Sequence, residues 1–209
     1  CRWDKPPVNL SKIAILLTKV SKSSIKFMTK ASKNKPILSI VVLYYNSQDY
    51  LEKWLASLAL SKLEKFQIKT IIVNNGATDG IAKINENKFK NNQIINPKFV
   101  YSPTNLGFAT GNNFGVKSVN PNSKYVLFVN DDMLFFPDTV FKMINFFEKN
   151  INVDASTCFV TLASTGKLAP EAHRGFPTPW NTFCYFFLPF ISNNYILKKD
   201  FSKTQKIDC

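Results

Sequence analysis

The stretch Tyr125-Val126-Leu127-Phe128-Val129, which runs directly into Asn130-Asp131-Asp132, decides the fold of this chain. An unbroken apolar run of this length is typical of a central strand covered on both faces. A carboxylate cannot stay ionised in such a layer without a partner, so we expect both aspartates at the strand's carboxyl end. Open α/β sheets bind ligands there. Two interpretations remain open: oxygen donors for a divalent cation, or a turn whose side chains cap backbone amides.

Other apolar runs alternate with helical patterns along the chain. Strands are predicted at 37–45, 70–73, 99–101 and 125–129. The i, i+3, i+4, i+7 spacing of a helix follows the first strand, at Leu51, Trp54, Leu55 and Leu58. Two more helices are predicted, one ending near Val119 and one beginning at Pro137-Asp138. This alternation predicts an α/β fold with a mainly parallel, doubly wound sheet whose loops gather at one rim.

The composition indicates a globular chain with an uneven charge. The 209 residues are 45% hydrophobic and carry a formal net charge of +13. Residues 1–36 hold nine Lys or Arg against one Asp, a balance of +8, which leaves 18 against 13, or +5, for the other residues. Because the excess lies mainly in this leader, the sequence does not favour a nucleic-acid-binding body, and no nucleic acid partner is expected.

The basic leader, 1–36, precedes a domain predicted over 37–209. Lysines recur every seventh residue at Lys12, Lys19, Lys26 and Lys33. With apolar residues on the other side, residues 10–33 are predicted to form a basic amphipathic helix. Such a helix packs on a domain or makes a peripheral contact with an anionic membrane surface, and both interpretations stay open.

Four cysteines, Cys1, Cys158, Cys184 and Cys209, show no CxxC spacing. We therefore expect Cys158 and Cys184 to be small apolar residues in a reducing compartment rather than metal ligands or a disulfide framework. The chain begins with Cys and ends within a pattern at 207–209, so we expect a fragment of a longer protein.

The loops after the four predicted strands begin at Asn46, Asn74, Asn105 and Asn130. They are rich in amides and glycines and hold hardly any Lys or Arg. Amides suit a base, ribose or sugar, and glycines let backbone amides approach phosphates. An anionic ligand at this rim needs its charge offset, which favours a cation at the aspartate pair.

Several other nucleotide and metal sites are not supported. No Gly-Lys-Ser/Thr follows the glycines, and no GxGxxG turn follows the first strand, which argues against P-loop and nicotinamide enzymes. The single histidine, His173, is more often a surface residue than a catalyst, and a histidine metal site needs a second one.

Four segments together resemble family 2 glycosyltransferases of the GT-A fold, above all their rhamnosyl- and galactofuranosyltransferase branch. They are residues 39–46, 73–80, 105–113 and 129–132. The resemblance covers about residues 37–180, in the family's order and spacing. Each motif alone is a weak signal. The occurrence of all four in the same order makes the resemblance specific.

The resemblance implies a set of site residues. The nucleotide-sugar donor would be bound by Tyr45, Asn46, Asn74, Asn75, Asp79, Asn105, Gly107, Gly111, Asn112, Asn113, Asn130 and Asp131. Asp132, with Asn130 beside it, would hold Mn²⁺ or Mg²⁺ at the family's DXD position, and Asp132 and Asp131 would be the catalytic pair. The segments 166–167 and 174–177 resemble the loop bordering the acceptor site.

Three departures accompany the resemblance. Asn74 stands where the family usually has an Asp that accepts from the base, and Asn130 replaces the first acid of many DXD motifs. The family's general base would lie beyond Cys209. The implied function is metal-dependent, inverting transfer of a sugar from a nucleotide-diphosphate sugar to a glycan or lipid-linked acceptor, in cell-surface polysaccharide synthesis in the cytoplasm.

Two other functions remain open. A degenerate nucleotide-sugar or glycan-binding module is suggested by Asn74 and Ala77 in place of more usual family residues. A nucleotidyltransferase on a similar sheet would normally have a cation in a glycine-rich loop after the first strand, and 46–49 offers neither.

One further cluster has no assigned role. It comprises the aromatic residues Trp180, Phe183, Tyr185, Phe186, Phe187 and Phe190. Such a cluster is more often core or a domain contact, and membrane docking together with the leader is the alternative.

Overall fold

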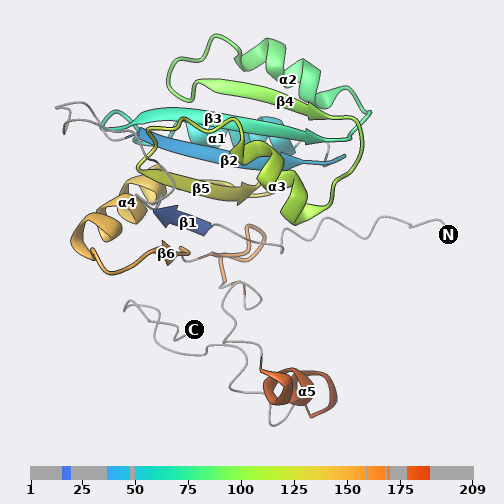
Figure 1. Ribbon diagram of the computed structural model, residues 1–209, viewed down its shortest axis with the longest axis vertical. Coiled ribbons are helices and arrows are strands. Elements are labelled where there is room, and N and C mark those ends of the chain that lie inside the picture. Colours follow the sequence, from blue (N-terminus) through green and yellow to red (C-terminus); the bar gives the residue numbers. More distant parts are fainter. Residues whose placement is uncertain are drawn as a thin grey trace. The chain divides into compact units, whose positions relative to one another are not determined.

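The computed structural model describes residues 16–19, 37–47, 50–158, 160–167, 169 and 178–188. The chain divides into two compact units. The first, here the sheet unit, spans 14–158, and the second, the terminal unit, combines 1–13 with 159–209. The sheet unit contains all of the strands and the first four helices in Figure 1.

A six-stranded sheet forms the centre of the sheet unit (Figure 1). Its strands are β1 (Leu16–Lys19), β2 (Ile37–Tyr44), β3 (Gln67–Asn75), β4 (Pro97–Ser102), β5 (Tyr125–Asn130) and β6 (Ala155–Ser156). They lie in the order β4-β3-β2-β5-β1-β6. Strands β4, β3, β2 and β5 are parallel neighbours, whereas β1 runs antiparallel to both β5 and β6. The predicted mainly parallel α/β sheet is therefore confirmed.

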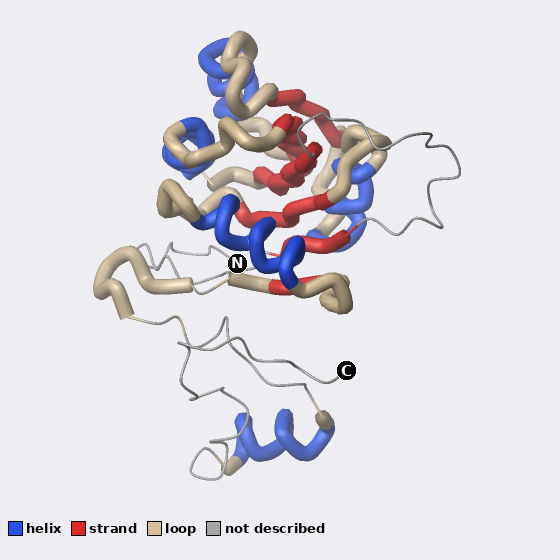
Figure 2. The backbone as a smooth tube through the Cα atoms, turned by 90° about the vertical axis from the view of Figure 1, so that its left-hand side faces the viewer, coloured by secondary structure: helices blue, strands red, loops and turns tan. Residues whose placement is uncertain are grey.

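Helices lie on both sides of the strands (Figure 2). They are α1 (Tyr50–Ala59), α2 (Ile81–Phe89), α3 (Phe108–Val116) and α4 (Thr139–Lys149), with α5 (Pro179–Phe187) in the terminal unit. On one face, Phe114 of α3 packs on a buried cluster that includes Val41 and Val73. On the other, the ring of Phe147 from α4 lies 5.7 Å from that of Tyr125. The sheet is thus wound on both faces, as the alternation predicted.

The predicted leader helix over 10–33 is wrong for Leu16–Lys19, which form strand β1. Its residues pair antiparallel with β5, from Leu16 opposite Phe128 to Lys19 opposite Tyr125. Without β1 the outer edge of β5 would leave backbone groups unpaired, and a short helix is costly to nucleate, so pairing with the sheet outweighs the helical pattern. The rest of the predicted helix lies outside the described residues.

The four predicted strands are all present, with longer bounds for β3 and β4. Helix α1 buries its predicted stripe of Leu51, Trp54, Leu55 and Leu58 completely. Helix α2 was not predicted, because its buried face includes the polar Asn85, which is 2% exposed. Among the described residues, no helix has the length and apolar character needed to cross a membrane.

Both described cysteines, Cys158 and Cys184, are free thiols. Cys184 is buried, and Cys158 is partly buried. Burial raises the pKa of the Cys158 thiol to about 11, so this group is protonated at neutral pH. His173 lies outside the described residues.

Candidate functional site

The carboxyl ends of four parallel strands meet at one rim of the sheet. Leu43 of β2 pairs with Asn130 of β5 on one side, and Tyr44 pairs with Asn74 of β3 on the other. Asn74 in turn pairs with Tyr101 of β4. The loops that the sequence singled out therefore begin side by side, which is the ligand-binding arrangement of open α/β sheets.

Asp131 is the most enclosed acidic group at this rim, at 8% exposure. Its carboxylate accepts a hydrogen bond from the Ser47 hydroxyl, which comes from the loop after β2. The pKa of Asp131 is raised to about 6, mainly by burial and in smaller part by the charge of Asp132, whereas the Ser47 hydrogen bond lowers it. The site therefore holds a carboxylate whose ionisation is costly near neutral pH.

Asn130 and Asp132 flank Asp131, and both are partly buried. In the part of the chain that the structure describes, no three His, Cys, Asp or Glu side chains cluster as a complete metal cage. Mg²⁺ and similar ions are usually held by one or two carboxylates plus phosphate oxygens, rather than by such a cage. Burial is the main cause of the raised pKa of Asp131, and the neighbouring charge of Asp132 contributes to it. The pair thus fits a divalent ion that arrives with phosphates.

The Asn74 side chain forms hydrogen bonds within its own turn. Its Nδ2 donates to the Ala77 carbonyl oxygen at 3.1 Å, and its Oδ1 accepts from the Ala77 backbone nitrogen at 2.7 Å. The residue is buried. Both ends of the amide are therefore engaged in closing the loop after β3.

Asn75 points to a different loop. Its Nδ2 donates to Asn105 Oδ1 at 3.0 Å and to the Gly107 carbonyl oxygen at 3.3 Å. Its Oδ1 accepts from the Leu106 backbone nitrogen at 3.0 Å. A single buried amide thus fixes residues 105–107, the segment that leads into α3. Here Asn75 positions the loop, a role that sequence reasoning did not assign to it.

Gly76 allows the loops after β3 and β4 to approach closely. Its φ is +80°, and a Cβ atom added to it would lie 2.5 Å from the Asn105 backbone nitrogen. Gly111 plays a similar part inside α3, where a Cβ would lie 2.6 Å from Leu43 Cδ1. Small residues are therefore required for these loops and α3 to sit against the sheet.

The other predicted residues on α3 differ in exposure. Asn112 is buried, and its Nδ2 donates to the Phe108 carbonyl oxygen at 2.9 Å within the helix. Asn113 is exposed, as are Asn105 and Gly107 at the start of this segment. Of these residues, the exposed ones offer groups to a ligand, whereas Asn112 mainly supports its own helix.

Tyr44 connects the central strand to the loop before α2. Its hydroxyl donates to Asp79 Oδ2, while Asp79 Oδ1 accepts from the Ile81 backbone nitrogen at 3.1 Å. Tyr45 is 47% exposed, and Asn46 follows with a positive φ of 49°, so the chain turns sharply after β2. The positioning roles of Tyr44 and Ser47 were missed from the sequence, where only their place beside Tyr45 and Asn46 could have indicated them.

The predicted acceptor-side segments are not part of the sheet unit. Gly166 and Lys167 belong to the terminal unit, where the Lys167 carbonyl oxygen accepts from the Leu162 backbone nitrogen at 2.8 Å. Residues 174–177 lie outside the described residues. The role of these segments stays a prediction.

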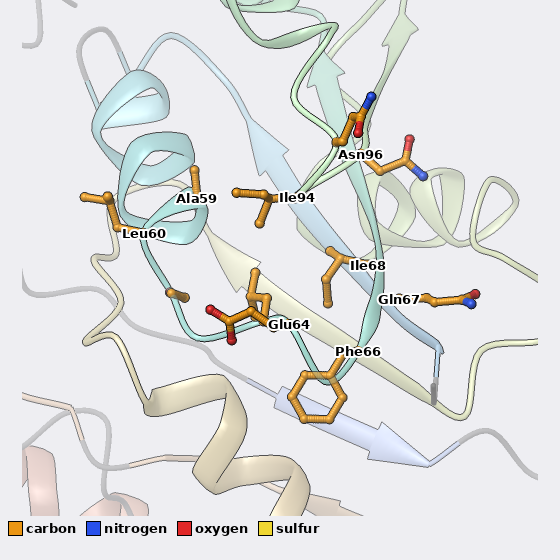
Figure 3. Close-up of a pocket in the computed structure, with 11 residues that line it drawn as sticks. Ala59, Leu60, Glu64, Phe66, Gln67, Ile68, Ile94 and Asn96 are labelled. Carbon is orange, nitrogen blue, oxygen red and sulfur yellow. The ribbon is translucent and has the colours of Figure 1, made fainter. Parts of the chain in front are cut away.

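A cavity of about 890 Å³ lies elsewhere on the sheet unit (Figure 3). It is lined by residues at the end of α1 and at the start of β3 and β4, namely Ala59, Leu60, Ser61, Leu63, Glu64, Phe66, Gln67, Ile68, Gln93, Ile94 and Asn96. None of the predicted site residues lines it, and Glu64 is its only charged side chain. This cavity is not the candidate active site, because the paired carboxylates and the amides lie at the opposite ends of the strands.

Comparison with known proteins agrees with this geometry. The model of the family described as "Glycosyl transferase family 2" matches residues 39–200. An uncharacterized glycosyltransferase of Rickettsia felis is 26% identical over 149 residues, which cover 71% of this chain and 23% of that protein. The teichoic acid poly(glycerol phosphate) polymerase of Staphylococcus epidermidis is 30% identical over 95 residues, 46% of this chain and 12% of that protein.

Among solved structures, S. aureus TarS 1-349 in complex with UDP-GlcNAc is 29% identical, with a TM-score of 0.47, covering 54% of this chain and 32% of that chain. The chain spans about a quarter of the Rickettsia relative, so these likenesses concern a part of longer proteins. The rhamnosyl- and galactofuranosyltransferase branch stays a prediction. The family model covers well over half of the sequence and the sheet is mainly parallel, so the expected GT-A fold class is confirmed, and the chain belongs to glycosyl transferase family 2.

Proposed function

We propose that the sheet unit binds a nucleotide-diphosphate sugar at the rim formed by β2, β3 and β5, and that the protein transfers this sugar with inversion. The observation that carries the proposal is the Asp131 and Asp132 pair at the end of β5, joined to the loop after β2 by Ser47. Membership of family 2 supports the reaction class. Donor binding would use the rim residues predicted from the sequence, from Tyr45 to Asn130.

The two aspartates would have separate tasks. Asp132, with Asn130 beside it, would hold Mn²⁺ or Mg²⁺, which when bound offsets the charge that develops on the departing diphosphate. Asp131 is kept in place by Ser47 and would orient its neighbour and share the positive charge of the site. Asn75 would hold the 105–107 loop at a fixed place beside the donor.

We further propose a glycan or lipid-linked acceptor and a role in cell-surface polysaccharide synthesis in the cytoplasm. The likeness to the Staphylococcus epidermidis teichoic acid polymerase supports the polysaccharide class. The free thiols of Cys158 and Cys184 are consistent with a reducing compartment.

A degenerate binding module is the second candidate, and one observation favours it. Asn74 stands where the family usually carries an acid, and both polar atoms of its amide are engaged within its own turn. Such a site could hold a nucleotide-sugar without turnover. The two candidates share donor binding and differ only in release of the nucleoside diphosphate.

Calorimetry with uridine and guanosine diphosphate sugars tests the donor site. Binding is expected with Mn²⁺ or Mg²⁺ and is expected to weaken at least tenfold with EDTA or in Asp132→Ala. Asp154→Ala, which changes an exposed acid of the same unit, is the matched control and should bind as the unchanged chain does. Equal affinity with and without metal would contradict the proposal. Release of nucleoside diphosphate by the whole protein in the presence of acceptor then separates an enzyme from a binding module.

A further inference from the structure

Helix α5 of the terminal unit carries a stripe of exposed aromatic side chains. Trp180, Phe183 and Phe187 are 65%, 46% and 68% exposed. They recur at i, i+3 and i+7, the spacing of one helix face. The rings of Trp180 and Phe183 are stacked with centroids 5.9 Å apart, and those of Phe183 and Phe187 with centroids 5.0 Å apart. The three rings form one continuous apolar surface, here called the aromatic stripe.

The helix also has a packed side. Cys184 is only 4% exposed, and its carbonyl oxygen accepts from the Leu188 backbone nitrogen at 2.9 Å, which extends the last turn. Thr182 is partly buried. The helix is therefore packed on one side. It buries Cys184 there, whereas its three large aromatic side chains stay exposed to solvent.

The sequence around α5 carries a net positive charge. Residues 159–209 hold six Lys or Arg against three Asp or Glu, a balance of +3. Helix α5 itself contains no charged residue. An aromatic surface within a segment of net positive charge complements an anionic, partly apolar partner.

We propose that the aromatic stripe of α5 docks on an anionic membrane surface, with its rings at the level of the lipid headgroups. Tryptophan and other aromatic side chains favour this interface, and nearby Lys or Arg add about 1 kcal/mol each through anionic lipids. Nine helical residues measure about 14 Å, under half of a bilayer's ~30 Å hydrocarbon core. The helix would therefore lie along the surface.

A second copy of the chain is the less suitable occupant. The exposed parts of the three rings amount to about 300–450 Å². A stable protein interface usually buries about 800 Å² on each partner. A membrane requires no such area, because each ring and each cation contributes to binding independently. The proposal does not depend on donor binding, although it would bring the protein to lipid-linked acceptors.

Co-sedimentation of the full chain with vesicles tests the proposal. Vesicles of phosphatidylcholine with 30% phosphatidylglycerol should bind the chain at least tenfold more tightly than pure phosphatidylcholine. The triple variant Trp180→Ala, Phe183→Ala, Phe187→Ala should lose at least tenfold in this binding. The matched control is the triple variant of three exposed aliphatic residues of the sheet unit, Leu60→Ala, Ile84→Ala and Ile94→Ala, which should bind as the unchanged chain does. Circular dichroism checks that both variants keep their fold.

Fluorescence quenching by brominated lipids gives a second measurement that needs no disruptive change. The measurement uses a Trp3→Phe background, because Trp3 is the third tryptophan of the chain. Trp54 is fully buried, so quenching in this background should come from Trp180 and should fall sharply when Trp180→Phe is added. Undiminished quenching in Trp180→Phe would overturn the proposal. So would unchanged vesicle binding in the aromatic triple variant, equal binding to neutral vesicles, or a dimer in solution that the same variant dissociates.

Discussion

The Ser47 hydroxyl donates a hydrogen bond to the Asp131 carboxylate, although the two residues are 84 positions apart in the sequence. The contact joins the loop after β2 to the acidic loop after β5. Removing it should leave Asp131 buried without its donor, which raises the pKa of Asp131 above about 6. The position and charge of the proposed metal site therefore depend on a neutral side chain.

Ser47→Ala should weaken metal-dependent donor binding about three- to tenfold, because a hydrogen bond to a charged group is worth roughly 1.5–3 kcal/mol, part of which water restores. Ser47→Thr keeps the hydroxyl and should recover most of the affinity. Calorimetry across pH 5 to 8 is the measurement, and Ser164→Ala, at an exposed serine, is the control. Equal affinities and equal pH profiles in Ser47→Ala and the unchanged chain would refute the positioning role.

Asp131→Asn should stabilise the metal-free fold at neutral pH. The folded pKa of about 6 exceeds the usual 3.8, so the acid form favours folding, and stability is lost as pH rises from about 4 to about 6. A shift of this size corresponds to at most about 3 kcal/mol. The variant should gain that amount at pH 7 and almost nothing at pH 4. Urea unfolding in EDTA at several pH values tests this, with Asp154→Asn as control; parallel stability curves for Asp131→Asn and the unchanged chain would contradict it.

Asn75→Ala should destabilise the fold by about 2–3 kcal/mol, because the three hydrogen bonds that this buried amide makes to residues 105–107 are lost. Hydrogen exchange should rise at Leu106 and Gly107 in particular. Asn113→Ala on the exposed side of α3 is the matched control and should cost under about 0.5 kcal/mol. Unchanged exchange at Leu106 in Asn75→Ala would mean that the loop is held by other contacts.

Gly76→Ala should cost about 3 kcal/mol or more, since the new Cβ would meet the backbone of Thr104 and Asn105 in addition to the strain of a positive φ. Gly80→Ala isolates the strain alone: its φ is +76°, but nothing lies within 4 Å of the added atom. That variant should cost only about 1 kcal/mol. Urea unfolding of both variants measures the difference, and equal losses would show that the close approach is not rigid.

Much of the fold could be predicted because its signals are local. The apolar runs of β2 and β5 could only be buried strands, and the stripe of α1 marked a helix, so the order of these elements along the chain already indicated a parallel sheet. The rim followed from the sheet, because parallel strands end on the same side. Helix α2 was missed because Asn85 interrupts its buried face.

The strand Leu16–Lys19 shows where local patterns fail. The lysines of the leader have a helical spacing, yet the backbone of this segment pairs with β5, more than a hundred residues away. A strand that pairs with an open sheet edge gains backbone hydrogen bonds along its whole length. The residue pattern of the leader contains no information about that edge, which is formed by a distant part of the chain.

By itself, the sequence determined the four parallel strands and the place of the acidic pair, since each depends on residue types within a short window, and it indicated the family through the order of four short motifs. Only the tertiary structure decided which polar groups form hydrogen bonds with each other. Asn74 and Asn75 are adjacent and chemically identical, but successive strand residues point to opposite sides, so one closes its own turn and the other holds the 105–107 loop. Likewise Ser47 gains its role only because parallel pairing of β2 and β5 brings its loop beside Asp131.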